Sequence, residues 1–191
     1  MINIYIFILI SFFLFSGKLY SSDKIEALKY LDSLKFFSAS FIQNDGDKLS
    51  EGEFYIGENR IRVEYAVPEK ILIILAKDKA MYYNYELEED EFFNPKNTSA
   101  WFFYDIFRDP LFFEYSKVTN KNNELILEKK GVDTDENNYL IRVYFEVKPT
   151  VLRGFELYVN SEYLEISIYN HNYNEEFNND FFKLISPTLL N

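Results

Sequence analysis

The sequence predicts an α+β fold that is mainly antiparallel β: a curved sheet or partial barrel with an amino-terminal helix and a second, short helix. From Gly52 to Pro95, apolar and polar residues alternate in one strand after another, which gives the sheet one apolar face. Short strands follow each other at near-hairpin spacing, and only two segments have helical periodicity.

The first element is an amphipathic helix, followed by a strand. Asp23 is the candidate N-cap, and the next residues, Phe36 to Gln43, change to a strand pattern that ends in a turn at Asn44 to Lys48. Within Asp23 to Phe37, apolar side chains recur at helical spacing at Ile25, Leu28, Leu31 and Leu34.

The strands after Gly52 supply the predicted wall of an apolar cavity. Alternation is strict from Arg60 to Tyr65, so one face of that strand is apolar and the other is charged. Pro68 separates two strands, and a hairpin is expected at Lys77 to Lys79. The residues that alternation assigns to the cavity wall are Phe54, Ile56, Ile61, Val63, Tyr65, Met81 and Tyr83.

The second helix is expected at Ala100 to Phe107, with Ser99 as its N-cap and Asp109-Pro110 as its stop. It is apolar almost all round, which is typical of a helix inside a core. Because it is short and follows an acidic turn, we expect it to close over the apolar face as a lid. The predicted lid residues are Trp101, Phe102, Phe103, Ile106 and Phe107.

Further strands complete the sheet. They are expected at Leu125 to Lys129, Tyr139 to Val147, Gly154 to Val159 and Tyr163 to Tyr169. An apolar tail with Phe181, Phe182, Leu184 and Ile185 ends the chain.

The length of the chain and its apolar first residues predict a single domain that is exported from the cytoplasm. Ile4 to Phe15 is an apolar run too short to span a bilayer, which indicates a signal peptide over residues 1–22 with cleavage near Ser21 or Ser22. An uncleaved anchor is the alternative. Residues 23–191 then form a single domain. The chain has no cysteine, which excludes disulfides, thiol catalysis and lipidation, so we expect a protein free in the periplasm.

Charge and motifs narrow the function classes. A net charge of −11 argues against nucleic acid, because no basic face is available to neutralise phosphates. His171 has no partner motif, and the acidic run from Glu86 to Glu91 lacks the ligand spacing of a calcium loop, so we expect a solvated turn there and no metal site. No catalytic motif or cofactor motif is present in the sequence.

The order of these segments is similar to that of a known family. The stretches FSASFIQ, FYI after Gly52, IRVEY, ILII after Pro68, MYYNYELEEDEFFNP and NTSAWFF resemble the periplasmic lipoprotein carrier LolA, in particular its alphaproteobacterial branch. The stretches FEVKPTVLRGFELYVNSEYLEISIYN and FNNDFFKLISP resemble the closing strands and the terminal stretch of that family.

This resemblance implies an unclosed β-barrel with a helical lid over a cavity that holds the acyl chains of lipoproteins. It also implies an inner-membrane ABC lipoprotein-releasing complex as donor and an outer-membrane acceptor lipoprotein, or the membrane itself, as recipient. The carrier uses no ATP and no cofactor. Where the family has an Arg-Pro pair whose arginine contacts the lid, this chain has Glu58 and Asn59, which leaves Arg60 and Arg62 as the candidate lid latch.

Two other functions remain open from the sequence. One is a periplasmic module of the same fold that senses a lipid or lipoprotein, and the other is an enzyme acting on lipids. For the carrier we expect a monomer that has lipoproteins as cargo and does not bind nucleic acid.

Overall fold

The computed structural model describes residues 22–133, 136–159, 162–178 and 180–189. The predicted leader, residues 1–21, lies outside these ranges.

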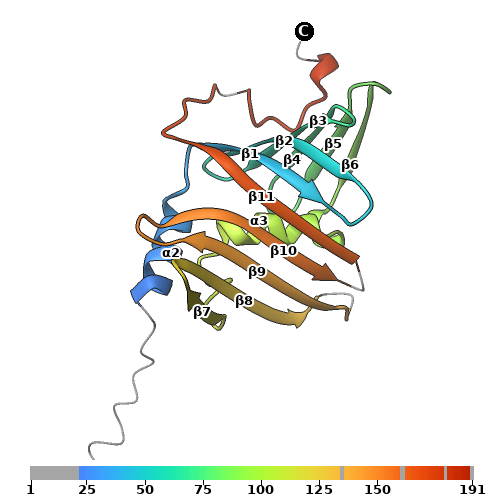
Figure 1. Cartoon of the computed structure of the whole chain (residues 1–191). Coiled ribbons are helices and arrows are strands. Elements are labelled where there is room, and N and C mark those ends of the chain that lie inside the picture. The colour runs from blue at the N-terminus through green and yellow to red at the C-terminus, as the bar shows by residue number, and fades with distance from the viewer. Residues whose placement is uncertain (1–21, 134–135, 160–161, 179, 190–191) are drawn as a thin grey trace, which may run out of the picture.

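The described residues contribute eleven strands to one antiparallel sheet in the order β6-β5-β4-β3-β2-β1-β11-β10-β9-β8-β7 (Figure 1). Neighbours in this order are neighbours in sequence except at the centre, where β1 pairs with β11. The strands are β1 Phe37–Asn44, β2 Leu49–Ile56, β3 Ile61–Val67, β4 Ile71–Leu75, β5 Ala80–Asn84, β6 Glu89–Phe93, β7 Lys117–Lys121, β8 Glu124–Val132, β9 Asn138–Glu146, β10 Val151–Val159 and β11 Glu162–Tyr173.

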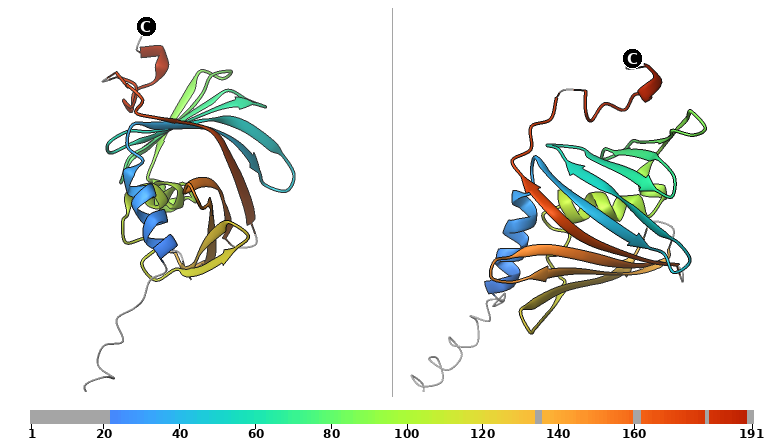
Figure 2. Two further views of the ribbon diagram at one scale, coloured as in Figure 1. Left: turned by 60° about the vertical axis from the view of Figure 1, so that its left-hand side comes forward. Right: turned by 45° about the horizontal axis from the view of Figure 1, so that its top comes forward.

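The sheet curves around the two described α-helices, α2 (Ser22–Ser33) and α3 (Ala100–Arg108), as Figure 2 shows. The edge strands β6 and β7 are not paired to each other, so the barrel is open. The chain passes from one edge to the other through a 3-10 turn, η1 (Pro95–Asn97), and α3. This connection explains why α3 lies in the hollow: the segment that links the two edges crosses the space between them.

Two glycines mark places where the sheet bends. Gly52 on β2 and Gly154 on β10 each lie at a shift of register. A Cβ on Gly52 would lie 2.1 Å from the carbonyl oxygen of Glu64, and one on Gly154 would lie 2.2 Å from that of Ile166. Only glycine allows such close backbone approach, which lets the sheet coil strongly enough to enclose a cavity.

The main core fills the concave side of the sheet. It joins the inward side chains of most strands to both helices, as the burial of Leu31 on α2 and Ile106 on α3 shows. Lys24 of α2 is also buried, and its Nζ donates to the carbonyl oxygens of Glu114 (3.0 Å) and Ser116 (3.2 Å). These bonds fix α2 to the segment that follows α3.

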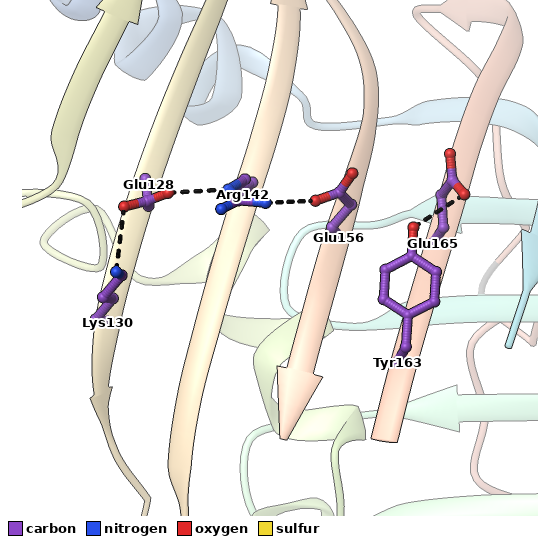
Figure 3. A network of polar contacts seen from close by, with 6 residues as sticks. All are labelled: Glu128, Lys130, Arg142, Glu156, Tyr163 and Glu165. Carbon is purple, nitrogen blue, oxygen red and sulfur yellow. Dashed lines mark hydrogen bonds and ion pairs between the residues drawn. The ribbon is translucent and has the colours of Figure 1, made fainter. Parts of the chain in front are cut away.

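The convex side carries ion pairs on the carboxyl-terminal half of the sheet. In Figure 3, Arg142 of β9 lies between Glu128 of β8 (2.9 Å) and Glu156 of β10 (3.1 Å). On β11, Tyr163 donates a 3.0 Å hydrogen bond to Glu165. The pairs of Arg142 connect neighbouring strands, and their residues alternate with buried core residues, as expected for a sheet with one solvated face.

On the amino-terminal half the convex side is apolar at β4 and β5, and the carboxyl-terminal segment covers part of it. Leu184 of this segment packs on a second cluster of buried side chains from β4 and β5, namely Leu72, Ile74, Met81 and Tyr83. Both faces of β4 and β5 are therefore buried.

The structure confirms the predicted fold class, an open, curved antiparallel sheet with two helices, and differs at several element ends. The first helix begins at Ser22, so Asp23 lies in its first turn instead of capping it. Ser99 makes no side-chain cap bond; Thr98 Oγ1 accepts from the backbone N–H of Ala100 (3.3 Å). The second half of the predicted acidic turn is the edge strand β6, whose side chains are mostly exposed. Strand pairing overrides the low β propensity of its acidic residues.

Candidate functional site

A cavity of about 650 Å³ lies between the concave face of the sheet and α3. This volume is within the range of about 300 to 1,000 Å³ that is usual for ligand sites. Most of its lining is apolar, and its charged residues come from the β1–β2 turn and the start of β11. The apolar lining comprises Phe41, Phe54, Val63, Ile73, Leu75, Phe102, Phe103, Ile106, Ile141, Phe155, Leu157, Val159, Leu164 and Ile166.

Three of the seven predicted wall residues line this cavity: Phe54, Val63 and Tyr65. Ile56 and Ile61 share their face of the sheet and are fully buried, but they belong to the surrounding core and do not line the cavity.

Met81 and Tyr83 lie on the opposite side of the sheet from the cavity, in the cluster under Leu184. The prediction that they line the wall is therefore wrong. Both faces of β4 and β5 are apolar. The sequence pattern of these strands therefore does not indicate which face lies on the concave side of the sheet.

The lid prediction concerns α3. Phe102, Phe103 and Ile106 line the cavity, while Phe107 is 4% exposed and packs on Phe54 with ring centroids 5.8 Å apart. Trp101 points elsewhere, toward Phe112 and Tyr139, at centroid distances of 6.3 and 6.0 Å, respectively.

Arg60 and Arg62 do not contact α3 in the way that the latch prediction requires. Arg60 donates to the carbonyl oxygen of Phe182 (2.6 Å) and Arg62 to that of Phe181 (2.7 Å), with the Arg62 guanidinium 4.4 Å from the Phe181 ring centroid. Both arginines thus hold the carboxyl-terminal segment against the convex face. The reason is their parity: they alternate with Ile61 and Val63, which face the core.

An arginine of α3 itself makes the contact expected of a latch. Arg108, in the last turn, donates to the carbonyl oxygens of Gly57, in the β2–β3 turn, and of Leu34 (3.4 Å), after α2. Burial lowers the pKa of Arg108, and its Nε finds no hydrogen-bond partner in the part of the chain that the structure describes. The sequence offered no signal for this role, because a basic residue in the last turn of a helix is common.

The outward side of α3 carries a carboxylate in an unfavourable setting. Burial, together with the nearby charge of Asp109, raises the pKa of Asp105 to about 6. Lys129, Lys96 and Lys77 oppose this shift only in part. The ionised form of Asp105 therefore destabilises the folded protein.

Replacement of this carboxylate should stabilise the protein in a pH-dependent way. The folded-state pKa lies above the ordinary value, so the wild type loses stability as the pH rises from about 4 to about 6. Asp105→Asn should raise the free energy of unfolding by about 1 kcal/mol above pH 6 and by much less at pH 4. Urea unfolding at both pH values measures this, with exposed Asp90→Asn as the control; an equal gain at both pH values would contradict the expectation.

The cavity-lining residues on β1 and on the carboxyl-terminal strands were not predicted from the sequence. Phe41, Ile141, Phe155, Leu157 and Ile166 line the cavity, and each alternates with polar or exposed neighbours in its strand. The strands were predicted, but nothing in their local pattern indicates that they face the same hollow as β2 and β3. Pairing of β1 with β11 brings the two halves together.

The remaining candidates for chemistry are placed as follows. The Nε2 of His171, on β11, lies 2.7 Å from the carbonyl oxygen of Leu152, and burial lowers the pKa of the imidazole. Among the described residues, no three His, Cys, Asp or Glu side chains are grouped so that they could hold a metal ion. Within the same ranges, neither α2 nor α3 combines the length and apolar character needed to cross a membrane.

An open antiparallel half-barrel with a helix inside it and an apolar cavity defines a binding protein for an apolar ligand. The family model described as "Outer membrane lipoprotein carrier protein LolA" matches residues 32–185, and the chain belongs to this family. The family is one of carrier proteins. A comparison with curated protein sequences found no match.

Solved structures of similar fold share little sequence with this chain. A conserved uncharacterised protein from Thermus thermophilus is 8% identical, with a TM-score of 0.54, over 81% of this chain and 88% of that one. MucB in complex with MucA(peri) is 11% identical (TM-score 0.48; 86% of this chain, 59% of that one). The Pseudomonas aeruginosa MucA/MucB complex is 10% identical (TM-score 0.48; 85% and 60%). At such identities the likeness concerns the fold alone.

Proposed function

We propose that this protein binds the acyl chains of lipoproteins released from the inner membrane and carries them across the periplasm to the outer membrane. The observation that carries this proposal is the apolar cavity of about 650 Å³ between the sheet and α3, in a chain of the lipoprotein carrier family. The sequence stretches quoted above favour the alphaproteobacterial branch of that family.

The energetics require such a cavity. An acyl chain of about 16 carbons loses roughly 12 kcal/mol on transfer from hydrocarbon to water, at about 0.8 kcal/mol per methylene. A carrier has to return most of this free energy by supplying apolar contacts. The aromatic and aliphatic side chains of the cavity can do so, and α3 exchanges its own contacts for those of the ligand when the cavity is filled.

The setting of the proposal follows from the family. Residues 1–22 act as a leader that directs residues 23–191 to the periplasm as one monomeric domain. An inner-membrane ABC lipoprotein-releasing complex supplies the cargo, and an outer-membrane acceptor lipoprotein or the membrane itself receives it. Transfer by the carrier needs neither ATP nor a cofactor, and we assign no enzymatic step to the chain.

A binding and hydrolysis experiment tests the proposal. The delipidated protein is titrated with a polyene fatty acyl methyl ester that fluoresces only in apolar surroundings, and a triacylated lipopeptide is added as competitor. We expect saturable fluorescence that the lipopeptide displaces, with all ester bonds intact by mass spectrometry. Absence of binding by folded protein would overturn the carrier proposal, and steady ester cleavage would favour an enzyme instead.

A further inference from the structure

The polar end of the cavity carries a carboxamide and several carboxylates, and the carrier role does not by itself explain them. Polar residues line the cavity where β1 ends and β11 begins, among them Gln43, Asp45, Asp47 and Glu162. The three carboxylate residues are exposed, and Gln43 is half-buried between them and the apolar interior. This gives the cavity a layered order, with apolar side chains inside, one carboxamide next, and carboxylates at the rim.

Strand pairing builds this rim from two distant parts of the chain. Asn44, at the end of β1, pairs with Glu165 of β11, which places the β1–β2 turn beside the start of β11. Glu162 has the same parity on β11 as Leu164 and Ile166, which line the cavity, so it lies on the concave face.

The carboxamide of Gln43 is oriented by a buried neighbour. Tyr65, which lines the cavity, donates a 2.8 Å hydrogen bond to Oε1 of Gln43. Burial raises the pKa of Tyr65 to about 12, so its hydroxyl stays protonated and remains a donor. With the amide held in this orientation, Gln43 has its NH₂ group as a hydrogen-bond donor for a ligand.

Gly52 makes this arrangement possible. The ring of Tyr65 lies edge-on to that of Phe41, with centroids 5.2 Å apart, above the position of Gly52. A Cβ on Gly52 would lie 2.9 Å from the Phe41 ring. A side chain there would displace the Phe41 ring, against which Tyr65 packs.

The charges at this end all have the same sign. Among the described residues that line the cavity, three are carboxylates and none is Lys, Arg or His. Asp45 accepts hydrogen bonds from the backbone N–H groups of Asp47 (3.1 Å) and Lys48 (2.8 Å), which hold its pKa below the usual value. The Lys48 side chain pairs with Glu69 at 3.6 Å instead of lining the cavity.

The amino terminus of α3 is also near this cavity, since Ser99 and Ala100 line it. A helix amino terminus attracts anions through its unpaired N–H groups. Here the N–H groups of Ala100, Trp101 and Phe102 already donate to Thr98 Oγ1, the Thr98 carbonyl and the Ser99 carbonyl, respectively. The helix therefore offers little compensation for the carboxylates.

We infer that the cavity selects acyl chains linked as esters or amides over free fatty acids. This inference rests on the proposed function. The Gln43 NH₂ donates to the carbonyl oxygen of the linked chain, while Asp45, Asp47 and Glu162 repel a free carboxylate that would sit at the same level. Free fatty acids released by lipid turnover would thus not occupy the carrier in place of lipoproteins.

The test compares three ligands with one acyl chain: a polyene fatty acid, its methyl ester and its N-methyl amide, titrated at pH 8. We expect the ester and amide to bind at least about tenfold more tightly than the acid, with the difference shrinking as salt rises. Asp47→Asn with Glu162→Gln should tighten acid binding several-fold and change ester binding much less. Asp45 is left intact because its carboxylate forms the turn.

Control variants separate the effect of the rim carboxylates from the effect of net charge, and test the hydrogen bond from Gln43. Asp90→Asn with Glu124→Gln removes the same charge from exposed edge positions and should change neither ligand. Gln43→Leu should weaken ester and amide binding by about 2- to 10-fold, the usual worth of one hydrogen bond. Tyr65→Phe, which releases the Gln43 amide, should have a smaller effect in the same direction.

The outcomes are distinguishable. If none of the three ligands binds, the proposed function itself fails. If acid and ester bind equally, if the acid binds better, or if the edge variant improves acid binding as much as the rim variant, the selectivity inference is overturned while the carrier role stands.

Discussion

Replacement of Ile73 by tryptophan is expected to weaken acyl-chain binding strongly by narrowing the cavity. Ile73, on β4, is half-buried and lines the cavity. A larger ring at this position enters existing empty space, so it does not force apart a packed core, and we expect a change in stability of less than about 1.5 kcal/mol. Probe fluorescence at saturation and urea unfolding measure the two effects.

The matched control is Ile42→Trp. Ile42 lies on β1, between the cavity-lining residues Phe41 and Gln43, and is exposed on the convex face. It should leave binding and stability unchanged. If Ile73→Trp folds normally and still binds the acyl probe as well as the control does, the ligand does not occupy this cavity.

The second large effect separates core from lid within α3. Phe107 is almost fully buried against Phe54, so Phe107→Ala should cost about 3 to 5 kcal/mol of unfolding free energy. Phe103 faces the cavity and is half-buried, so Phe103→Ala removes fewer contacts and should cost about 1 to 2 kcal/mol. It should, however, alter probe affinity per folded molecule more than Phe107→Ala does.

These variants decide whether α3 is a lid. Both phenylalanines contact Phe54 at similar centroid distances, 5.6 Å for Phe103 and 5.8 Å for Phe107, so they form a matched pair. Equal losses of stability with unchanged binding in both variants would show that α3 is ordinary core. A binding change confined to Phe103→Ala would show that α3 yields to the ligand.

The residue types in the sequence were enough to predict the second helix and its position against the apolar face of the sheet. Eight residues, 100–107, are almost all apolar and are followed by Asp109-Pro110, a strong local signal for the end of a helix. Three of the five predicted lid residues line the cavity for this reason. Trp101 could not be placed, because a helix that is apolar all round gives no indication of which side faces the sheet.

The contacts of Arg60, Arg62 and Arg108 could not be predicted, because they depend on which carbonyl groups lie within reach and not on the residue type. Arg60 and Arg62 follow the parity of β3, which directs them to the convex face, where the carboxyl-terminal segment offers carbonyl groups. Arg108 reaches Gly57 and Leu34 only because α3 crosses the hollow. Neither distance in sequence nor residue type indicates these contacts.

The sequence by itself determined the antiparallel class, the positions of most strands and the two helices, because period and stop signals are local properties of the chain. Tertiary structure alone decided which face of β4 and β5 is concave, since both faces are apolar and one is covered by Leu184. It also decided the charged rim. Asp47 and Glu162 meet only through the pairing of β1 with β11, and such long-range pairing is set by the closure of the whole sheet.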